Sequence, residues 1–268
     1  MVNYSTFKSL EVTVENQVAT LRIVPYGAAV ESRDRHWELG EIFGMLRGDN
    51  EVRVVVLTGR DEHFLTPPSR SAPGSTKHYT DPKSAWQIFT GIIRCHETMA
   101  LMEKPIVAKV NGDAIGFGAN LVFAADLIVA ARHARFADHH LAMGDLPGMD
   151  VPFGVVPGDG GLARMPLILS PVRAKEYLML ARQYTAPELE AIGAINYAVD
   201  ADQLDARVDQ MVADLLRRPA YSLAWTKRLA NKAVLAHLHS VLDAAAAYEM
   251  VDFFHLEKMG GENILSLE

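Results

Sequence analysis

A buried strand that leads straight into a glycine-rich turn and an apolar helix is the feature that most constrains this chain. Residues 106–110 form a short apolar strand, the turn contains Gly116 and Gly118, and residues 119–125 are apolar and suited to a helix. Glycine lets bare backbone approach a ligand, and the start of a helix leaves backbone N–H groups free. Such a junction suits the stabilisation of negative charge on a carbonyl oxygen. We therefore expect an oxyanion-binding site at this turn.

The order of apolar segments predicts an α/β core. Near-continuous apolar strands alternate with segments of helical spacing, a pattern typical of βαβ units whose strands are buried on both faces. The strands are residues 52–58, 106–110 and 127–131, and the helices are residues 34–47 and 86–103. A mostly parallel sheet with right-handed crossovers follows. Residues 11–14 and 18–23 predict a β-hairpin ahead of it, and residues 59–83, rich in Pro, Ser and Gly, predict a long loop.

The pattern turns helical after Gly161. Residues 172–181, 187–193, 201–217 and 220–256 predict helices, the last one interrupted near residues 235–240. The alanine run at residues 244–247 indicates a tightly packed helix at a subunit or domain contact. We expect an α/β core over residues 1–200 and a helical region over residues 201–268 that serves oligomerisation and covers the pocket.

Composition excludes several classes of function. The chain has 268 residues and a formal net charge of −7, so it offers no basic stripe for nucleic acid. Cys95 is the only cysteine, which favours a reducing compartment over a disulfide framework. The sequence shows no apolar signal core at residues 1–8 and no run of about 18 apolar residues. We expect a cytoplasmic protein with no membrane partner.

Taken together, the order of motifs resembles the crotonase superfamily, the enoyl-CoA hydratase/isomerase family. The matching segments are residues 51–59 (EVRVVVLTG), 104–112 (KPIVAKVNG), 124–130 (AADLIVA), 134–136 (ARF), 154–161 (GVVPGDGG) and 191–196 (AIGAIN). The resemblance implies a spiral of ββα units with a C-terminal helical trimerisation region, in a homotrimer or a dimer of trimers. It also implies an acyl-CoA thioester substrate whose enolate is held by two backbone N–H groups. No separate cofactor is implied, since coenzyme A is part of the substrate.

The resemblance assigns the oxyanion hole and its surroundings. One donor is the backbone N–H of Phe117; the other aligns with Pro68, which has no N–H. Either the loop register differs, with Ser69 or Thr66 taking over, or this half of the hole is broken. The resemblance further implies a set of residues that contact substrate: Thr66, Gly116, Gly118, Asn120 and Gly158.

The acid–base residues depart from the family pattern. The two glutamates of the family's hydratases align with Asn120, which cannot transfer protons, and with Asp150. Asp159 is a second acid. Family members that isomerise double bonds or cleave β-diketones resemble this chain in having an acidic residue at this position. Two carboxyl groups facing one pocket tend to separate in pKa, which leaves one as acid and one as base. We expect Asp150 and Asp159 to be the catalytic pair.

A histidine pair lies in a segment that is longer than is typical of the family. His139 and His140, with Asp138 and Asp145 nearby, could suggest a metal site, but adjacent residues do not share a face. We favour a solvated loop here and expect no metal. The alternative is that residues 138–149 cover the pocket and contribute a histidine as an acid.

Three functions remain open. The first is an enoyl-CoA hydratase/isomerase-like enzyme in which aspartates replace the usual glutamates. The second is a hydrolase that cleaves a C–C bond of a β-diketone without coenzyme A, which the altered segment at Pro67 and Pro68 favours. The third is a catalytically inactive protein with a crotonase fold, favoured by Asn120 and Pro68.

Overall fold

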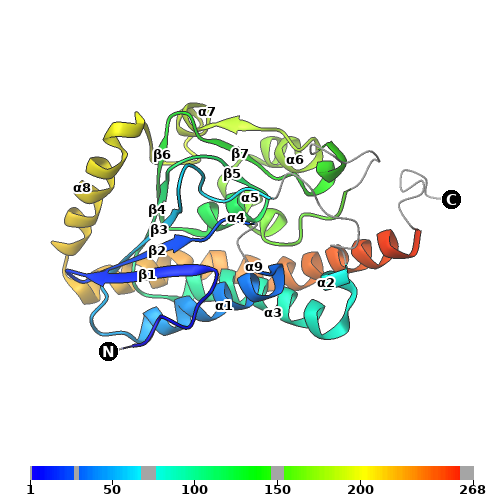
Figure 1. Cartoon of the computed structure of the whole chain (residues 1–268). Coiled ribbons are helices and arrows are strands. Elements are labelled where there is room, and N and C mark those ends of the chain that lie inside the picture. The colour runs from blue at the N-terminus through cyan, green and yellow to red at the C-terminus, as the bar shows by residue number, and fades with distance from the viewer. Residues whose placement is uncertain (1, 27–29, 68–76, 146–153, 260–268) are drawn as a thin grey trace.

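A twisted six-stranded sheet forms the centre of the molecule (Figure 1). The computed structural model describes residues 2–26, 30–67, 77–145 and 154–259. The strands are ordered β1-β2-β3-β4-β6-β9, and every neighbouring pair is parallel except the β1–β2 hairpin. Their bounds are Leu10–Glu15, Val18–Ile23, Val54–Gly59, Ile106–Val110, Leu127–Ala131 and Tyr197–Val199. The predicted hairpin and the mostly parallel sheet are confirmed.

A second sheet of three very short strands was not predicted. It consists of β5 (Ala114–Ile115), β7 (Arg135–Ala137) and β8 (Tyr184–Thr185). β5 directly precedes helix α4 (Phe117–Ala124), and β7 directly precedes the segment that contains His139 and His140. The small sheet therefore brings the glycine-rich turn and the histidine segment together.

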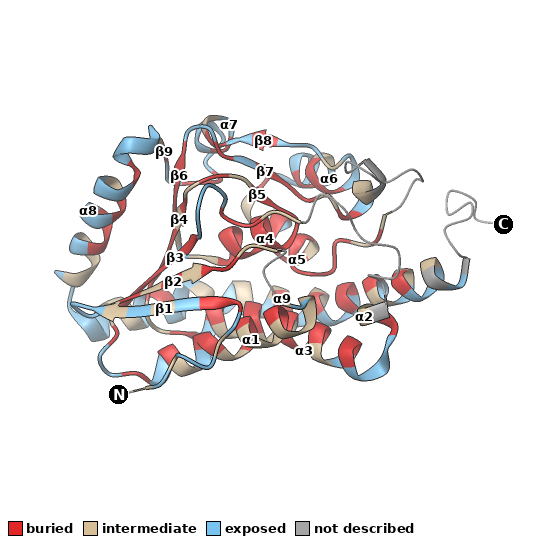
Figure 2. Ribbon diagram, viewed as in Figure 1, coloured by how far each residue is buried: buried red, intermediate tan, exposed pale blue. Residues whose placement is uncertain are grey.

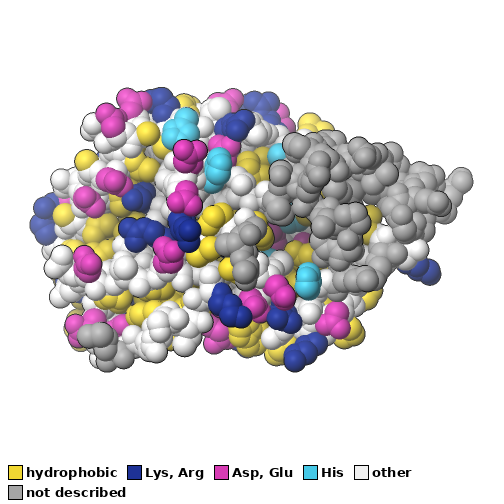
Figure 3. Space-filling model, viewed as in Figure 1, with side chains coloured by type: hydrophobic (Ala, Val, Ile, Leu, Met, Phe, Trp, Pro, Cys, Tyr) yellow, Lys and Arg dark blue, Asp and Glu magenta, His cyan; other side chains and the backbone are white. Residues whose placement is uncertain are grey.

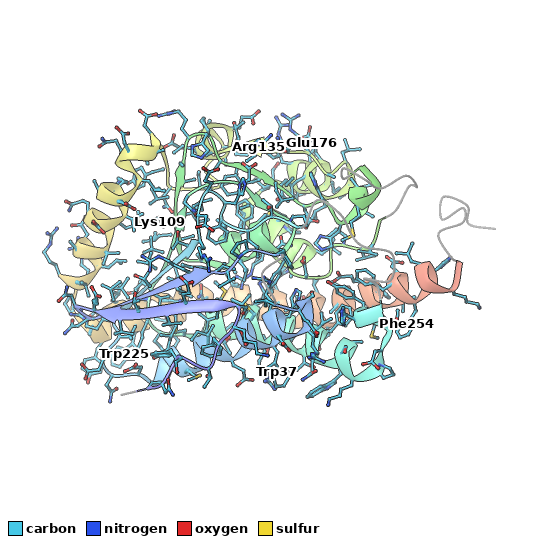
Figure 4. All side chains as sticks on the ribbon, viewed as in Figure 1. Trp37, Lys109, Arg135, Glu176, Trp225 and Phe254 are labelled. Atoms are coloured by element: carbon cyan, nitrogen blue, oxygen red, sulfur yellow. The ribbon has the colours of Figure 1, made fainter. Side chains whose placement is uncertain are left out.

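Helices cover both faces of the main sheet. On one face lie α1 (Ser32–Gly48), α3 (Pro82–Leu101) and the long α9 (Ala220–Met259), and on the other lies α8 (Leu204–Leu216) (Figures 1 and 2). Lys109 of β4 points toward α8, where it pairs with Asp205 at 2.7 Å (Figure 4). The shorter helices are α5 (Gly161–Ile168), α6 (Pro171–Met179) and α7 (Ala186–Ala191).

Two sequence predictions about helices were wrong. α9 runs without a break through residues 235–240, where His239 and Ser240 are exposed while Leu238 stays buried. The loop predicted over residues 59–83 ends earlier than expected, at α2 (Lys77–Thr80) and at α3. Asp81 starts α3 by accepting a hydrogen bond from the backbone N–H of Ser84 at 2.9 Å.

α9 folds back onto the core of its own chain. Leu238 and Leu242 pack with Ala100 and Ala163, and Ala245 approaches the backbone at Gly158. A Cβ atom on Gly158 would lie only 2.5 Å from the carbonyl oxygen of Ala245. Small residues at this contact let the helix carry its polar side chains close to the middle of the molecule. Within the described part of the chain, no helix has the length and apolar character needed to cross a bilayer.

We expect Leu242→Ala to lower the free energy of unfolding by about 2–4 kcal/mol, because it leaves a cavity between α9 and α3. Val251→Ala, on the exposed side of the same helix, is the control and should change it by less than about 0.5 kcal/mol. Chemical denaturation measures both. Equal effects would mean that α9 does not pack on its own core in solution.

Candidate active site

The glycine-rich turn is held beside a second backbone segment. The N–H of Ile115 donates to the carbonyl oxygen of Leu65 at 2.9 Å, so the chain leaving Leu65 passes the start of α4. Gly116, at φ +62°, is the residue before the helix and turns the chain into it. The N–H of Phe117 lies in the first turn of α4, where backbone donors lack partners within the helix. This geometry suits an anionic oxygen.

A buried cluster of ionisable groups lies at this turn. Asp138, His140 and Asp159 are each at most 5% exposed. His140 Nδ1 is 2.6 Å from a carboxylate oxygen of Asp138, and His140 Nε2 is 3.1 Å from one of Asp159. An added Cβ on Gly116 would lie 4.0 Å from His140 Cε1, which places the imidazole next to the turn. The imidazole is thus clamped between two carboxylates.

The solvated loop predicted for the histidine pair was wrong for His140. Asp138 accepts hydrogen bonds from both the ring and the backbone N–H of His140, so it turns the chain and holds the ring inward. The N–H of Val155 then donates to the carbonyl oxygen of His140 at 2.8 Å. In the sequence, the only indication of this arrangement is Asp138, an acidic residue directly before the histidine pair.

Opposing effects set the protonation of His140. Burial alone would lower its pKa, but the negative charges of Asp159 and Asp138 and their hydrogen bonds outweigh burial and raise the pKa well above the ordinary value. In return, His140 lowers the pKa of Asp138 against the effect of burial. The cluster therefore holds an imidazolium at neutral pH.

Glu249 of α9 extends the cluster and was missed from the sequence. Its Oε1 lies 3.8 Å from His140 Nε2, and the side chain is buried. Burial raises the pKa of Glu249, and the negative charges of Asp159 and Asp138 raise it further. The positive charge of His140 lowers it, but the pKa stays well above its usual range. The one signal in the sequence was an acid one helical turn after Ala245, on the face that the alanine run buries.

Asn120 supports the carboxylates from α4. Its Nδ2 donates to Asp159 at 2.6 Å and to Asp138 at 3.3 Å. Asn120 Oδ1 and Glu249 Oε2 are buried without a hydrogen-bond partner among the described residues. Asn120 thus contributes a hydrogen-bond donor that holds the side chain of Asp159 in place.

Asp159 is also fixed through its backbone. His96 Nε2 donates to the carbonyl oxygen of Asp159 at 2.8 Å, and Arg164 donates to the carbonyl oxygen of His96 at 2.9 Å. Burial, with the charge of Arg164, lowers the pKa of His96 to about 3, so the ring is a neutral donor. Gly160 has φ +126°, and a Cβ there would lie 2.2 Å from His96 Nε2, so only glycine fits.

The same three groups have the composition of a metal site. One ligand atom each from Asp138, His140 and Asp159 lies within 4.8 Å of the others. Both ring nitrogens of His140 face carboxylates, so the imidazolium occupies the place that a cation would take between them. A divalent ion would require the neutral imidazole and loss of the contact from Nε2 to Asp159.

Aromatic side chains line the approach to the cluster. The rings of His36 and Phe117 are 4.5 Å apart, and burial lowers the pKa of His36 to about 4. Tyr26 lies close enough for Asp159 and His140 to shift its pKa, which burial raises overall. Tyr79 stacks on Phe253 of α9 at 4.0 Å. The surroundings of the cluster are therefore largely apolar.

The structure brings together part of the site predicted from the sequence. Asp159, Asn120 and Gly158 meet at the cluster, and Gly116, Phe117 and Gly118 form the turn beside it. Thr66 directly follows Leu65 and is half-buried. Three predicted residues lie outside the described residues and stay predictions: Pro68, Ser69 and Asp150.

We expect the ring of His140 to remain protonated at a pH where an exposed histidine, with a pKa of about 6.5, is neutral. Because the folded-state pKa is raised, His140 stabilises the fold fully below the unfolded pKa and loses that effect as the pH rises through the folded value. NMR titration of the ring measures the pKa, and Asp138→Asn should lower it. Titration of His140 at or below about 6.5 would contradict the clamp.

Comparisons with known proteins agree with this architecture. The sequence profile of the enoyl-CoA hydratase/isomerase family matches residues 32–261. Carnitinyl-CoA dehydratase of Citrobacter koseri is 30% identical over 205 residues, covering 76% of this chain and 73% of the relative. That of Escherichia coli K12 is 29% identical over 240 residues, with 84% and 86% covered.

Solved structures show the same fold. An enoyl-CoA hydratase/isomerase from Mycobacterium paratuberculosis superposes with a TM-score of 0.80 at 25% identity, covering 91% of this chain and 93% of the other. A β-diketone hydrolase from the cyanobacterium Anabaena, bound to (S)-3-oxocyclohexyl acetic acid, superposes with a TM-score of 0.82 at 20% identity, with 95% and 97% covered. Since the profile match extends over most of the sequence, the chain belongs to the enoyl-CoA hydratase/isomerase family.

Proposed function

We propose that the protein is a hydrolase that cleaves a C–C bond of a β-diketone without coenzyme A. The observation that carries this proposal is the His140 imidazolium between Asp138 and Asp159, beside the free N–H of Phe117. Hydrolytic cleavage needs an acceptor for a proton of water, a donor for the oxyanion, and an acid that protonates carbon. The cluster and the turn supply one group for each task.

The chemistry follows from these roles. Asp159 accepts a proton from water as the water oxygen bonds to one carbonyl carbon. The bond from that carbon to the carbon between the carbonyls then breaks, and its electron pair forms the enolate of the other carbonyl, stabilised by the N–H of Phe117. The His140 imidazolium protonates the enolate carbon, which leaves a ketone and a carboxylic acid. The proton on Asp159 returns to His140 across their 3.1 Å contact.

Two further observations support this proposal. Burial and the neighbouring carboxylates raise the pKa of Glu249, whose Oε1 lies 3.8 Å from His140 Nε2, and so favour a carboxyl group that can donate beside His140. The surrounding Tyr26, His36 and Phe117 suit a compact apolar ring. The Anabaena β-diketone hydrolase shares the fold.

An acyl-CoA hydratase or isomerase is the second candidate, favoured by the carnitinyl-CoA dehydratase relatives. Here the thioester oxygen would be held at Phe117, with a second donor at Ser69 or Thr66. Asp159 and Asp150 would move protons on the acyl chain, and coenzyme A would enter as part of the substrate. Its phosphates call for positive charge, yet basic and acidic side chains lie intermixed over the described part of the face in Figure 3.

Incubation with 2,2-dimethylcyclohexane-1,3-dione in oxygen-18 water tests the first candidate. This diketone has no acidic hydrogen between its carbonyls and stays neutral. We expect a ring-opened keto acid with one labelled carboxyl oxygen. Asp159→Asn should lower the rate at least about 100-fold, since the water loses its proton acceptor. Asp205→Asn, at an exposed surface pair, is the matched control and should keep full activity.

The outcomes separate the three functions. Hydration of crotonyl-CoA, or binding of acetoacetyl-CoA much tighter than free coenzyme A, without diketone cleavage would favour the second candidate. A folded protein that neither turns over the diketone nor binds acetoacetyl-CoA would favour the non-catalytic role that Asn120 and Pro68 suggest.

We also propose that a second copy covers the first half of α9, in a homotrimer or a dimer of trimers. Trp225 and Leu229 are 63% and 62% exposed and, four residues apart, share one face of α9. Trp225 and Phe254 lie at opposite ends of α9 (Figure 4), and Glu249 of the cluster is on the half that contains Phe254. Large apolar side chains that are exposed together in a single chain often mark a surface that another protein chain buries.

Light scattering on the purified protein should give a mass three or six times that of the 29.5 kDa chain. Trp225→Glu combined with Leu229→Glu should reduce it, because the contact would bury charge. Trp86→Glu, at an exposed tryptophan of α3, is the control and should leave the mass unchanged. A monomeric wild-type protein would contradict the proposal.

A further inference from the structure

Arg35 of α1 is the most fully buried cation of the described chain, and its charge has no carboxylate partner there. Its side chain is fully buried, and no described acid lies within ion-pair distance. Nη1 donates to the carbonyl oxygen of Val24 at 2.6 Å. Nε and Nη2 have no hydrogen-bond partner among the residues that the structure describes. A buried charge without a partner is strongly unfavourable, so such an arrangement needs a physical reason.

The nearby acids are all engaged elsewhere. Glu38 accepts hydrogen bonds from the backbone of Lys8 and Ser9 and from the Ser9 hydroxyl. Asp34 pairs with Lys8 and Arg33. The other buried arginine, Arg164, places two of its nitrogens on His96. Arg35 alone of these residues keeps two free donors.

The free donors form one edge of the guanidinium. Nε and Nη2 are the pair that binds a carboxylate side-on, with two parallel hydrogen bonds. The guanidinium carbon lies 4.3 Å from the centre of the Tyr26 ring. Tyr26 in turn lies within electrostatic reach of Asp159 and His140. Tyr26 therefore contacts Arg35 and lies in the neighbourhood of the reacting cluster.

We propose that Arg35 binds a carboxylate of the substrate, at a position distinct from the bond that reacts. Such a contact narrows the substrate of the proposed hydrolase to a small cyclic β-diketone that carries a carboxylate. The cluster holds three carboxyl groups and one imidazolium, so an anionic substrate requires a separate cation to bind there. A single carboxylate can accept both parallel hydrogen bonds from this edge of the guanidinium. The inference rests on the proposed function only for the identity of the reacting group.

Calorimetric titration with cyclohexanecarboxylate and with cyclohexanecarboxamide tests the proposal. The two probes match in size, and only the first is charged. We expect the wild-type protein to bind the carboxylate at least about tenfold more tightly, as for a charge-assisted hydrogen-bonded pair. Arg35→Met should remove this preference, and Arg35→Lys should keep part of it. Arg33→Met, two residues away at an arginine that is already paired, is the control and should keep all of it.

Thermal unfolding without ligand separates a binding role from a structural one. Arg35→Met removes a buried unpaired charge, so its Tm should equal or exceed that of the wild type. A lowered Tm together with an unchanged preference for the carboxylate would overturn the proposal. So would equal binding of both probes, or of neither, by the wild-type protein.

Titrations with inorganic phosphate and with free coenzyme A distinguish the remaining source of an anion. One outcome is that the wild-type protein binds phosphate or coenzyme A more tightly than cyclohexanecarboxylate, and that Arg35→Met abolishes that binding. This result would show that Arg35 binds a phosphate, and it would overturn the proposal of a substrate carboxylate. The probes need no turnover, so failure of the diketone assay leaves this test intact. Diketone cleavage with no preference for a carboxylated ligand would uphold the proposed function and reject the role of Arg35.

Discussion

The clamp on His140 is the interaction on which the rest of the site depends. A buried imidazolium is tolerable only between Asp138 and Asp159, and each carboxylate is tolerable there only beside the imidazolium. Asn120, the backbone contact from His96 and the close approach of α9 serve to keep Asp159 in place. Loss of His140 would leave two buried carboxylates without their cation, and loss of either aspartate would leave His140 with a single carboxylate partner. The site is therefore a cooperative unit drawn from α4, α9 and the segments before α5.

This arrangement changes the chemistry that a crotonase fold can perform. The glycine-rich turn places the N–H of Phe117 at the start of α4, where the proposed mechanism uses it to stabilise an enolate. In the proposed mechanism His140 is the acid and Asp159 the base, while Asn120 holds Asp159 by a hydrogen bond. An imidazolium and a carboxylate in contact can exchange a proton directly, which suits a reaction that both takes a proton from water and returns one to carbon. The same fold thus carries two kinds of acid–base apparatus.

Sequence reasoning predicted the parts of the fold that have strong local patterns. Ile106–Val110 and Leu127–Ala131 match their predicted bounds because both strands are apolar on two faces and are bounded by turns. β5, β7 and β8 have two or three residues each and carry no period. The predicted break in α9 failed because polar residues such as His239 and Ser240 can lie on the exposed side of a continuous helix.

The candidate site was predicted where a motif marks it and missed where tertiary contacts create it. Asp159 and Phe117 lie in recognisable glycine-rich segments. His140 and Glu249 acquire their roles only when β7 and α9 bring them to Asp159, a contact that no local pattern encodes. Arg35 likewise looks like an ordinary helical arginine until its burial is known.

A double-mutant cycle on the diketone reaction tests the central claim most directly. His140→Gln and Asp159→Asn are each compared with the wild type, and then with the double variant, by kcat/KM. If the two residues act as one unit, either single change removes nearly all of the rate and the second adds little. Losses that multiply in the double variant would show that His140 and Asp159 act independently, and would contradict the clamp as the reactive centre.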